Sequence, residues 1–324
     1  MIKLPTPPQF AGAFFKRLSR IACSSLMLLA LAAPLPAVDM LYVTLTNDTI
    51  VTYDTTGNVG ATILATKATF ASTNLNAPRG LAFDSTGNLY AANLSNNTIS
   101  KFNGSGTYLS SISSNLVAPQ GLAFDSTGNL YAANSGNTIS KFNASGAYLS
   151  NITSNLSGPQ GLAFDSTGNL YAANTGGSTI SKFNSSGGFL SSIGSISNLN
   201  SPIGLAFDST GNLYAANYSG NTISKFNASG GFLSSIGSSS NLNSPIGLAF
   251  DSSGNLYAAN LNNNTISKFD SSGTFLTSWS TGTANPRYLA FKPVTVPEPS
   301  TYALATIATG VMAYLARRRK ARGV

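Results

Sequence analysis

A phrase of sixteen residues that recurs along the chain constrains the fold more than any other feature. In one of its fullest copies the phrase runs from Pro202 to Asn217 and reads PIGLAFDSTGNLYAAN. Its aspartate returns every 40 to 43 residues, at Asp84, Asp125, Asp165, Asp208 and Asp251. A period of about 40 residues indicates a solenoid, a propeller or an array of small units.

Each repeat unit predicts four short strands separated by turns that contain Gly or Asn. In the unit that begins at Pro202, the expected strands are 204–208, 213–217, 222–227 and 232–236. The first two strands are apolar on both faces, whereas the third, Thr-Ile-Ser-Lys-Phe, alternates. Burial therefore falls from the first strand to the last. This gradient is typical of a propeller blade, which packs between neighbours and is innermost at its first strand.

The two ends of the repeat region complement each other. Residues 40–77 form a unit that lacks its first strand, and residues 286–291 are a first strand with no unit after it. Pairing the two closes a ring without an unpaired inner edge. With the complete units, which begin at Pro78, Pro119, Pro159, Pro202 and Pro245, the ring has six blades. We predict an all-β, six-bladed propeller closed by its N- and C-terminal strands.

The motif Pro-x-Gly-Leu-Ala-Phe-Asp-Ser-x-Gly-Asn-Leu-Tyr-Ala-Ala-Asn, followed by Ile-Ser-Lys-Phe, resembles the NHL repeat over about residues 40–292. The resemblance implies a propeller, since that family forms six-bladed rings among others. Tyr42-Val43-Thr44 is similar to the strands of YVTN propellers, which often have seven blades, so seven remains an alternative. A WD40 propeller is disfavoured because the chain has no histidine and one tryptophan.

Residues 1–37 have the pattern of a secretory signal peptide. A basic segment ends at Arg20, an apolar run spans 21–33, and Ala37 is a small residue suited to cleavage. The alternative, an N-terminal membrane anchor, needs a longer apolar run. We predict a signal helix in 1–37 followed by a propeller domain in 38–295. The single cysteine, Cys23, lies in the signal, so the exported chain would have no disulfide.

Residues 296–324 form a tail with three parts. The motif Pro297-Glu298-Pro299 is followed by an apolar run to Ala316, and then by Arg317, Arg318, Arg319 and Lys320. A helix over 300–316 would be about 26 Å long, a marginal transmembrane span. This order of parts resembles the PEP-CTERM sorting signal. The alternative is a plain C-terminal membrane anchor.

The PEP-CTERM resemblance implies where the protein is located in the cell. It also implies processing by an exosortase-type membrane peptidase in a Gram-negative bacterium. The precursor would be anchored in the inner membrane by the C-terminal helix, and the product would reach the cell surface or the extracellular matrix.

The net charge of +8 comes from the two ends of the chain. Between residues 38 and 300 there are nine Lys and Arg against ten Asp and Glu. A nucleic-acid-binding surface needs clustered basic residues, so the propeller is not expected to bind nucleic acid.

The residues required by common catalytic sites are missing. Without histidine, Ser-His-Asp triads and His metal ligands are excluded. The only glutamate is Glu298, and the five repeat aspartates all begin hairpins, where they are expected to cap turns. We therefore predict no catalytic, cofactor or metal residues and no enzymatic activity. A cation-dependent, lactonase-like hydrolase is the alternative, because gluconolactonase-type propellers resemble this fold.

Two rings of identical residues follow from the repeat. The asparagines that end the second strands are expected to cap turns, although a ring of amide oxygens leaves weak Ca²⁺ binding open. They are Asn93, Asn134, Asn174, Asn217 and Asn260, with Leu45 at the matching place. The lysines of the third strands are expected to form a solvated face near the rim, with attraction of an anionic polysaccharide as the alternative. They are Lys101, Lys141, Lys182, Lys225 and Lys268.

The position between Pro and Gly varies while its neighbours do not. Because it precedes the innermost strand, it is expected to face the mouth of the central channel. Its occupants form the candidate ligand-binding mouth: Arg79, Gln120, Gln160, Ile203, Ile246 and Arg287. Drift at a tolerant loop position is the alternative. We predict an exported binding or structural module that binds a protein or a polysaccharide of the envelope or matrix.

Overall fold

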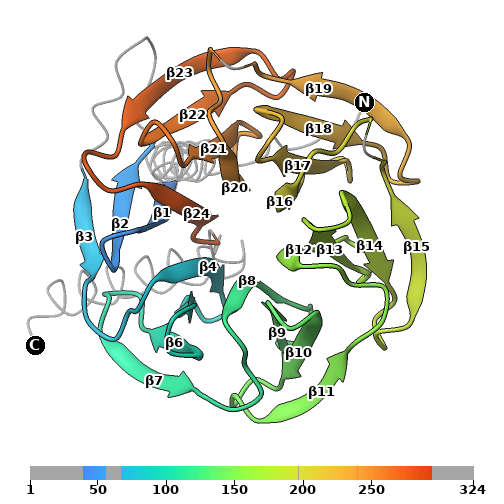
Figure 1. Ribbon diagram of the computed structural model, residues 1–324. Helices are drawn as coiled ribbons and strands as arrows, with labels where there is room; N and C mark the ends of the chain where they lie inside the picture. The colour runs from blue at the N-terminus through green and yellow to red at the C-terminus, as the bar shows by residue number, and fades with distance from the viewer. Residues whose placement is uncertain (1–38, 56–66, 196, 239, 294–324) are drawn as a thin grey trace, which may run out of the picture. The chain divides into compact units, whose positions relative to one another are not determined.

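The computed structural model describes residues 39–55, 67–195, 197–238 and 240–293. These residues form six four-stranded antiparallel sheets around a common centre (Figure 1), which confirms the all-β six-bladed propeller. The expected signal helix in 1–37 and the C-terminal helix lie outside the described residues. No helix in the described part is long and apolar enough to cross a membrane. The described residues all belong to one compact unit.

We name the sheets blade 1 to blade 6 and give their strands from the centre outward. Blade 1 has β24 (Pro286–Phe291), β1 (Met40–Leu45), β2 (Thr49–Asp54) and β3 (Ala68–Ala71). Blade 2 has β4 (Pro78–Phe83), β5 (Leu89–Asn93), β6 (Thr98–Phe102) and β7 (Tyr108–Ile112). Blade 3 has β8 (Pro119–Phe124), β9 (Leu130–Asn134), β10 (Thr138–Phe142) and β11 (Tyr148–Ile152).

The other three blades repeat this order. Blade 4 has β12 (Pro159–Phe164), β13 (Leu170–Asn174), β14 (Thr179–Phe183) and β15 (Phe189–Ile193). Blade 5 has β16 (Pro202–Phe207), β17 (Leu213–Asn217), β18 (Thr222–Phe226) and β19 (Phe232–Ile236). Blade 6 has β20 (Pro245–Phe250), β21 (Leu256–Asn260), β22 (Thr265–Phe269) and β23 (Phe275–Ser280).

Blade 1 closes the ring with strands from both ends of the repeat region. Strand β24 pairs antiparallel with β1, with Phe291 opposite Leu41 and Leu289 opposite Val43. The predicted closure is therefore confirmed. Because β24 has β1 as its partner, the inner strand of blade 1 has the same place in its sheet as the inner strands of the other blades.

The hydrophobic core lies between adjacent blades. The second strands of blades 2 to 6 are completely buried, and the outermost strands of these blades are mostly exposed, so burial falls from the second strand outward. The innermost strands are buried less completely than the second strands. The predicted fall from the first strand is wrong at that point, because an innermost strand has a neighbouring strand of its sheet on one side only. At each interface an aromatic residue crosses from one blade to the next; Tyr171 of blade 4 meets Phe207 of blade 5 edge to face at 5.0 Å. Such a pair contributes about 0.5–1.5 kcal/mol beyond the area it buries.

Glycines allow the innermost strands to approach one another closely. A Cβ added at Gly204 of β16 would overlap the carbonyl oxygen of Ile246 in β20. Equivalent overlaps arise at Gly80, Gly121, Gly161 and Gly247, each against the next blade. The repeated glycine is therefore a requirement of inner-ring packing, and any blade without it must join its neighbour differently.

Candidate functional site

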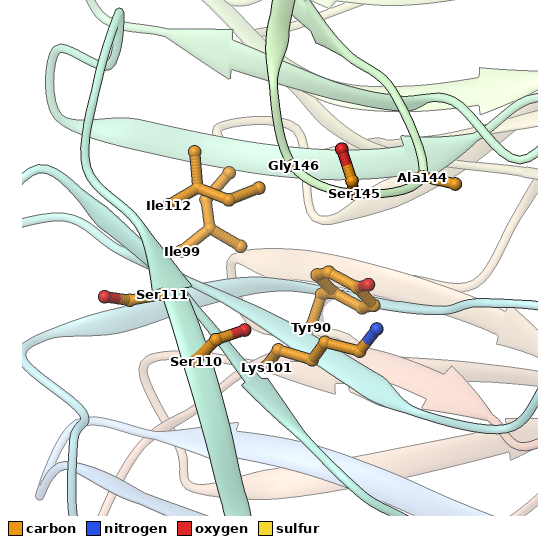
Figure 2. Close-up of a pocket in the computed structure, with 9 residues that line it drawn as sticks. All are labelled: Tyr90, Ile99, Lys101, Ser110, Ser111, Ile112, Ala144, Ser145 and Gly146. Carbon is orange, nitrogen blue, oxygen red and sulfur yellow. The ribbon is translucent and has the colours of Figure 1, made fainter.

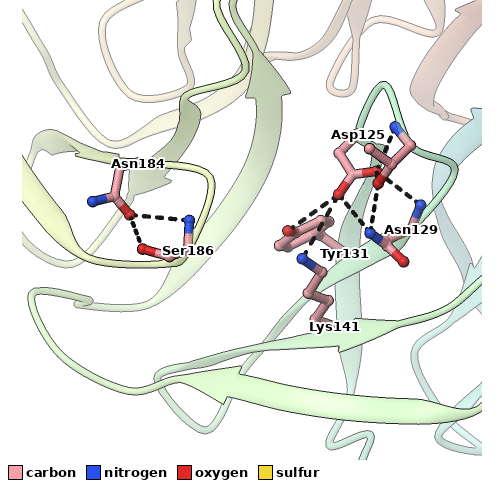
Figure 3. A network of polar contacts seen from close by, with 7 residues as sticks. Asp125, Asn129, Tyr131, Lys141, Asn184 and Ser186 are labelled. Carbon is pink, nitrogen blue, oxygen red and sulfur yellow. Dashed lines mark hydrogen bonds and ion pairs between the residues drawn. The ribbon is translucent and has the colours of Figure 1, made fainter.

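The repeat aspartates cap the first hairpin of blades 2 to 6, as predicted. In blade 3, Asp125 Oδ1 accepts the backbone N–H of Thr127 at 3.0 Å and of Asn129 at 2.8 Å (Figure 3). Its Oδ2 accepts hydrogen bonds from the Asn129 amide at 2.9 Å and the Tyr131 hydroxyl at 3.3 Å. Blades 2, 4, 5 and 6 make the same two backbone bonds. Both carboxylate oxygens are thus engaged in the turn.

These hydrogen bonds favour the charged form of the carboxylates. Burial alone would raise the pKa of Asp165, but hydrogen bonds from Asn169 and Thr167 outweigh it and lower that pKa to about 2. The pKa of Asp208 is lowered to about 2 by the same balance of burial and turn hydrogen bonds. Asp165 and Asp208 are therefore poorly suited to act as proton acceptors near neutral pH.

The lysine ring is not the freely solvated face that the sequence predicts. The Lys141 ammonium lies 3.8 Å from Asp125 Oδ2 and 5.0 Å from the centre of the Tyr131 ring. In blades 2 to 5 the lysine side chains are 20–24% exposed, and Lys268 of blade 6 is 10% exposed. The prediction is wrong because each lysine lies directly opposite the tyrosine of the second strand, which turns it towards the aspartate.

Small pockets lie beside these lysines, between adjacent blades. One, of about 120 Å³, is bounded by Tyr90, Lys101 and Ile112 of blade 2 and by Ser145 and Gly146 of blade 3 (Figure 2). A second, of about 160 Å³, includes Tyr171 and Lys182 of blade 4 and lies against blade 5. Both pockets use the same repeated Tyr–Lys pair, so they follow from the blade architecture and do not single out one position in the ring.

The asparagine ring is part of the blade structure. Asn174 is buried; its Oδ1 accepts the backbone N–H of Ser157 at 3.1 Å and its amide donates to Ser181 Oγ at 2.8 Å. The other four asparagines make the same two kinds of bond. Because the oxygens are engaged by backbone N–H groups, they do not form an open ring of cation ligands. Among the described residues, no three His, Cys, Asp or Glu side chains are grouped to hold a metal ion.

The six variable residues lie at the second position of the innermost strands. The strand order β24, β4, β8, β12, β16, β20 around the ring places the two arginines, two glutamines and two isoleucines in adjacent pairs. That arrangement is as expected, but the residues lie inside the strands and not in a loop before them. Gln120 and Ile246 are buried, and the Gln120 amide donates to Ser135 Oγ at 3.2 Å. Two of the six residues of the candidate mouth are therefore not accessible to a ligand.

One junction in the inner ring differs from the other five. Blade 1 has Tyr288 where the other inner strands have glycine, and Thr44 where the other second strands have alanine. The Thr44 hydroxyl accepts the backbone N–H of Tyr288 at 3.0 Å and donates to the carbonyl of Arg79 at 3.0 Å. Our sequence analysis missed both residues. The signal was visible as a tyrosine in Pro-Arg-Tyr-Leu, where five units have Pro-x-Gly-Leu.

This β24–β4 junction contains two buried polar atoms without a partner among the described residues, Arg79 Nε and the Tyr288 hydroxyl. Burial raises the pKa of Tyr288, against the opposing effect of the Arg79 charge, so the phenol is neutral at pH 7. Burial lowers the pKa of Arg79, although a guanidinium remains charged at neutral pH. Each unmet hydrogen bond costs about 1–3 kcal/mol. The junction therefore carries a positive charge and two buried hydrogen-bond donors, Arg79 Nε and the Tyr288 hydroxyl, that lack an acceptor among the described residues.

Neither arginine of the junction forms an ion pair with a described acidic residue. All five ion pairs in the described part of the chain use lysines, and neither Arg79 nor Arg287 takes part in one. The two arginines are neighbours because β24 and β4 are adjacent inner strands. The arrangement can hold a hydrogen-bond acceptor of negative charge.

Comparison with known proteins identifies the tail. Residues 295–320 match the PEP-CTERM protein-sorting motif. The predicted sorting signal is therefore confirmed. The matched span contains the residues assigned to it, which are Pro297, Glu298, Pro299, Arg317, Arg318 and Arg319. The match supports export, a membrane-anchored precursor and processing by an exosortase in a Gram-negative bacterium. No curated protein matches the chain.

Solved structures share the propeller fold at low sequence identity. A chain of the nidogen/laminin complex is 19% identical, with a TM-score of 0.68 over 79% of this chain and 98% of that chain. A catalytically inactive virginiamycin B lyase from Staphylococcus aureus, with quinupristin, is 14% identical, with a TM-score of 0.60 over 80% and 94%. A protein of unknown function from Bacteroides caccae is 14% identical, with a TM-score of 0.61 over 80% and 100%. At these identities the likeness concerns the fold alone.

Proposed function

We propose that this exported propeller is a non-enzymatic binding module, and that it holds a polymer of the cell envelope or extracellular matrix at the β24–β4 junction. One observation carries the proposal. Five junctions of the inner ring repeat the same glycine packing, whereas the sixth replaces it with Tyr288 and Thr44 beside the two adjacent arginines. A local departure from an otherwise uniform repeat is where a specific ligand would be recognised.

Binding is favoured over catalysis by the chemistry of the junction. Arg79 and Tyr288 supply hydrogen-bond donors and positive charge, but a hydrolase also needs a base or nucleophile placed beside its substrate. The repeat aspartates are engaged in turns, and the chain has no histidine. The alternative is a cation-dependent, lactonase-like hydrolase, and the fold is shared with a lyase.

The proposed destination follows from the sorting signal. A chain processed at residues 295–320 would be released from its membrane anchor on the outer side of the inner membrane. The propeller body carries few charges and many Ser, Thr and Asn residues. Such a surface produces no strong long-range electrostatic field. Ligand recognition would therefore depend on local sites such as the β24–β4 junction.

A binding test compares the wild-type chain with an Arg79→Ala, Arg287→Ala double variant on arrays of bacterial polysaccharides and on immobilised envelope proteins. The wild type is expected to be retained, and the double variant to be retained less. Lys292→Ala serves as the control, since it removes a positive charge whose side chain lies beside Gly87 and Gly104 of blade 2. Equal retention of the wild type and the double variant would contradict the proposal.

An activity test addresses the alternative function. The purified chain is incubated with a panel of lactones, with and without divalent cations. We expect no turnover under either condition. Cation-dependent turnover that is lost in the Arg79→Ala, Arg287→Ala variant would establish the enzyme and overturn the proposal.

A further inference from the structure

We propose that the β24–β4 junction binds a carboxylate group, and that this carboxylate belongs to a uronic acid of an acidic polysaccharide. The assignment rests on the proposed function, because it names the chemistry of the polymer held there. It begins with the two unsatisfied donors, Arg79 Nε and the Tyr288 hydroxyl. Tyr288 is only 8% exposed, so this phenol is a built-in part of the inner ring.

The two donors require an acceptor with particular properties. A guanidinium can only donate, and the neighbouring phenol can donate one hydrogen bond as well. Arg79 and Tyr288 lie close enough for the charge of one to act on the other. A ligand that presents two acceptor oxygens would satisfy both groups, and a planar carboxylate matches the fork of a guanidinium.

The ligand can reach the arginine. Arg79 is partly exposed, and its Nε is the only nitrogen of the side chain that is both covered and without a partner. Thr44 fixes the backbone on both sides of the junction, through the N–H of Tyr288 and the carbonyl of Arg79. The two strands are therefore held together at the junction.

The rest of the ring favours a sugar. Next to the two arginines in the ring are Gln120 and Ile246, which are buried, and beyond these are Gln160 and Ile203, which are partly exposed. A polysaccharide that extends from the junction has groups that match this series: the carboxylate of a uronic acid, and the hydroxyls and apolar C–H faces of its sugars. A sulfate or phosphate group would find no further described basic residue beside the two arginines in the inner ring.

The direct test measures binding of the full chain, purified in detergent, by calorimetry at low salt. The probes are polygalacturonate oligomers, the same oligomers with their carboxyl groups reduced to alcohols, polyglutamate and dextran sulfate. We expect polygalacturonate to bind, and the carboxyl-reduced form to bind at least about tenfold more weakly, since a charge-assisted hydrogen bond is lost.

Matched variants locate the site. Arg79→Gln is expected to weaken polygalacturonate binding about tenfold, and Tyr288→Phe, which removes only the hydroxyl, by a few-fold. Lys292→Gln removes the same charge as Arg79→Gln at the opposite end of β24 from Arg287, beside Gly87 and Gly104, and is expected to leave affinity unchanged within about twofold. Melting curves of each variant establish that it is folded before its affinity is compared.

The outcomes separate the ligand assignment from the proposed function. Equal binding of native and carboxyl-reduced oligomers, or tighter binding of dextran sulfate, would overturn the carboxylate while leaving a binding module in place. Tighter binding of polyglutamate would make the partner an acidic protein segment and overturn the sugar assignment. If Lys292→Gln weakened binding as much as Arg79→Gln, the attraction would be general charge and the site would be wrong. If the wild type bound no array polymer or probe, the proposed function would fail as well.

Discussion

The Thr44 hydroxyl joins Tyr288 to Arg79: it accepts the backbone N–H of one at 3.0 Å and donates to the backbone carbonyl of the other at 3.0 Å. The other five blades have alanine in place of Thr44 and glycine in place of Tyr288. A tyrosine cannot adopt the close glycine packing, because even a Cβ at the glycine positions would overlap the next strand. The two departures from the repeat occur together, and we infer that each depends on the other.

This dependence predicts a strong coupling between the two residues. Thr44→Ala leaves the buried N–H of Tyr288 without an acceptor and should lower the free energy of unfolding by about 1–3 kcal/mol. Thr44→Ala combined with Tyr288→Gly restores the Ala–Gly pair of the other junctions and should recover most of that loss. Urea unfolding of the four proteins gives the coupling energy. Simple addition of the two single effects would contradict the interpretation.

The inner-ring glycines make a steric prediction. Gly204→Ala places a methyl group against the carbonyl of Ile246 and should destabilise the fold by about 1–3 kcal/mol, as overpacking does. Gly136→Ala is the matched control, since a Cβ there has no neighbour within 4 Å and its backbone is not left-handed. Thermal melting compares the two. If both variants lost the same stability, the effect would come from glycine itself and not from the close approach of the blades.

The capping aspartates can be tested by separating charge from hydrogen bonding. Asp165→Ala removes the acceptor for the N–H groups of Thr167 and Asn169 and should cost about 2 kcal/mol. Asp165→Asn keeps an acceptor oxygen and should cost about 1 kcal/mol or less, since the ion pair with Lys182 is partly exposed.

The chain itself provides a precedent for the Asp165→Asn change. Asn184 caps the third hairpin of the same blade, between β14 and β15, by accepting the N–H group of Ser186 at 3.1 Å (Figure 3). It also accepts the N–H group of Gly188 at 2.8 Å. Denaturant unfolding of the Asp165 variants would show the difference. Equal losses for the alanine and asparagine variants would mean that the charge of Asp165, and not its turn geometry, stabilises the blade.

The architecture could be predicted from the sequence because the same strand and turn pattern recurs in every repeat unit. The strands, the turn role of Asp125 and the closure by β24 all follow from local patterns copied from unit to unit. The environment of Lys141 could not be read in this way, because it depends on the cross-strand register that places Lys141 opposite Tyr131. The repeat shows that a lysine is on the third strand, but not which groups it faces.

The candidate site was predicted only in part. The ring order, with Arg287 next to Arg79, follows from the closure of the propeller and was expected. Aligning the repeat units would have identified Tyr288, because it replaces a glycine that the other five units share. The prediction considered only the variable position before it, which Arg287 occupies. The unsatisfied atoms of Arg79 and Tyr288 could not be predicted, because a missing partner is a property of three-dimensional packing.

Stability is expected to fall in acid over a defined range. Asp165 and Asp208 have an ordinary pKa of 3.8 and a pKa of about 2 in the folded chain. A lowered folded-state pKa stabilises the fold above the unfolded value, and this contribution is lost as pH falls towards the folded value. The melting temperature should therefore change little above about pH 5 and decline between about pH 4 and pH 2. A melting temperature that rose over that interval would contradict the capping role.

The sorting signal predicts the C-terminus of the exported protein. Because residues 295–320 match the PEP-CTERM motif, the mature form should lack the basic segment from Arg317 onward. Intact mass spectrometry of the exported and membrane fractions measures this directly. Replacing the central acid, Glu298→Ala, should leave the full tail on a membrane-bound precursor, while Lys292→Ala, just before the motif, should be processed normally. An exported form that still ends at Val324 would show that the tail is an ordinary anchor.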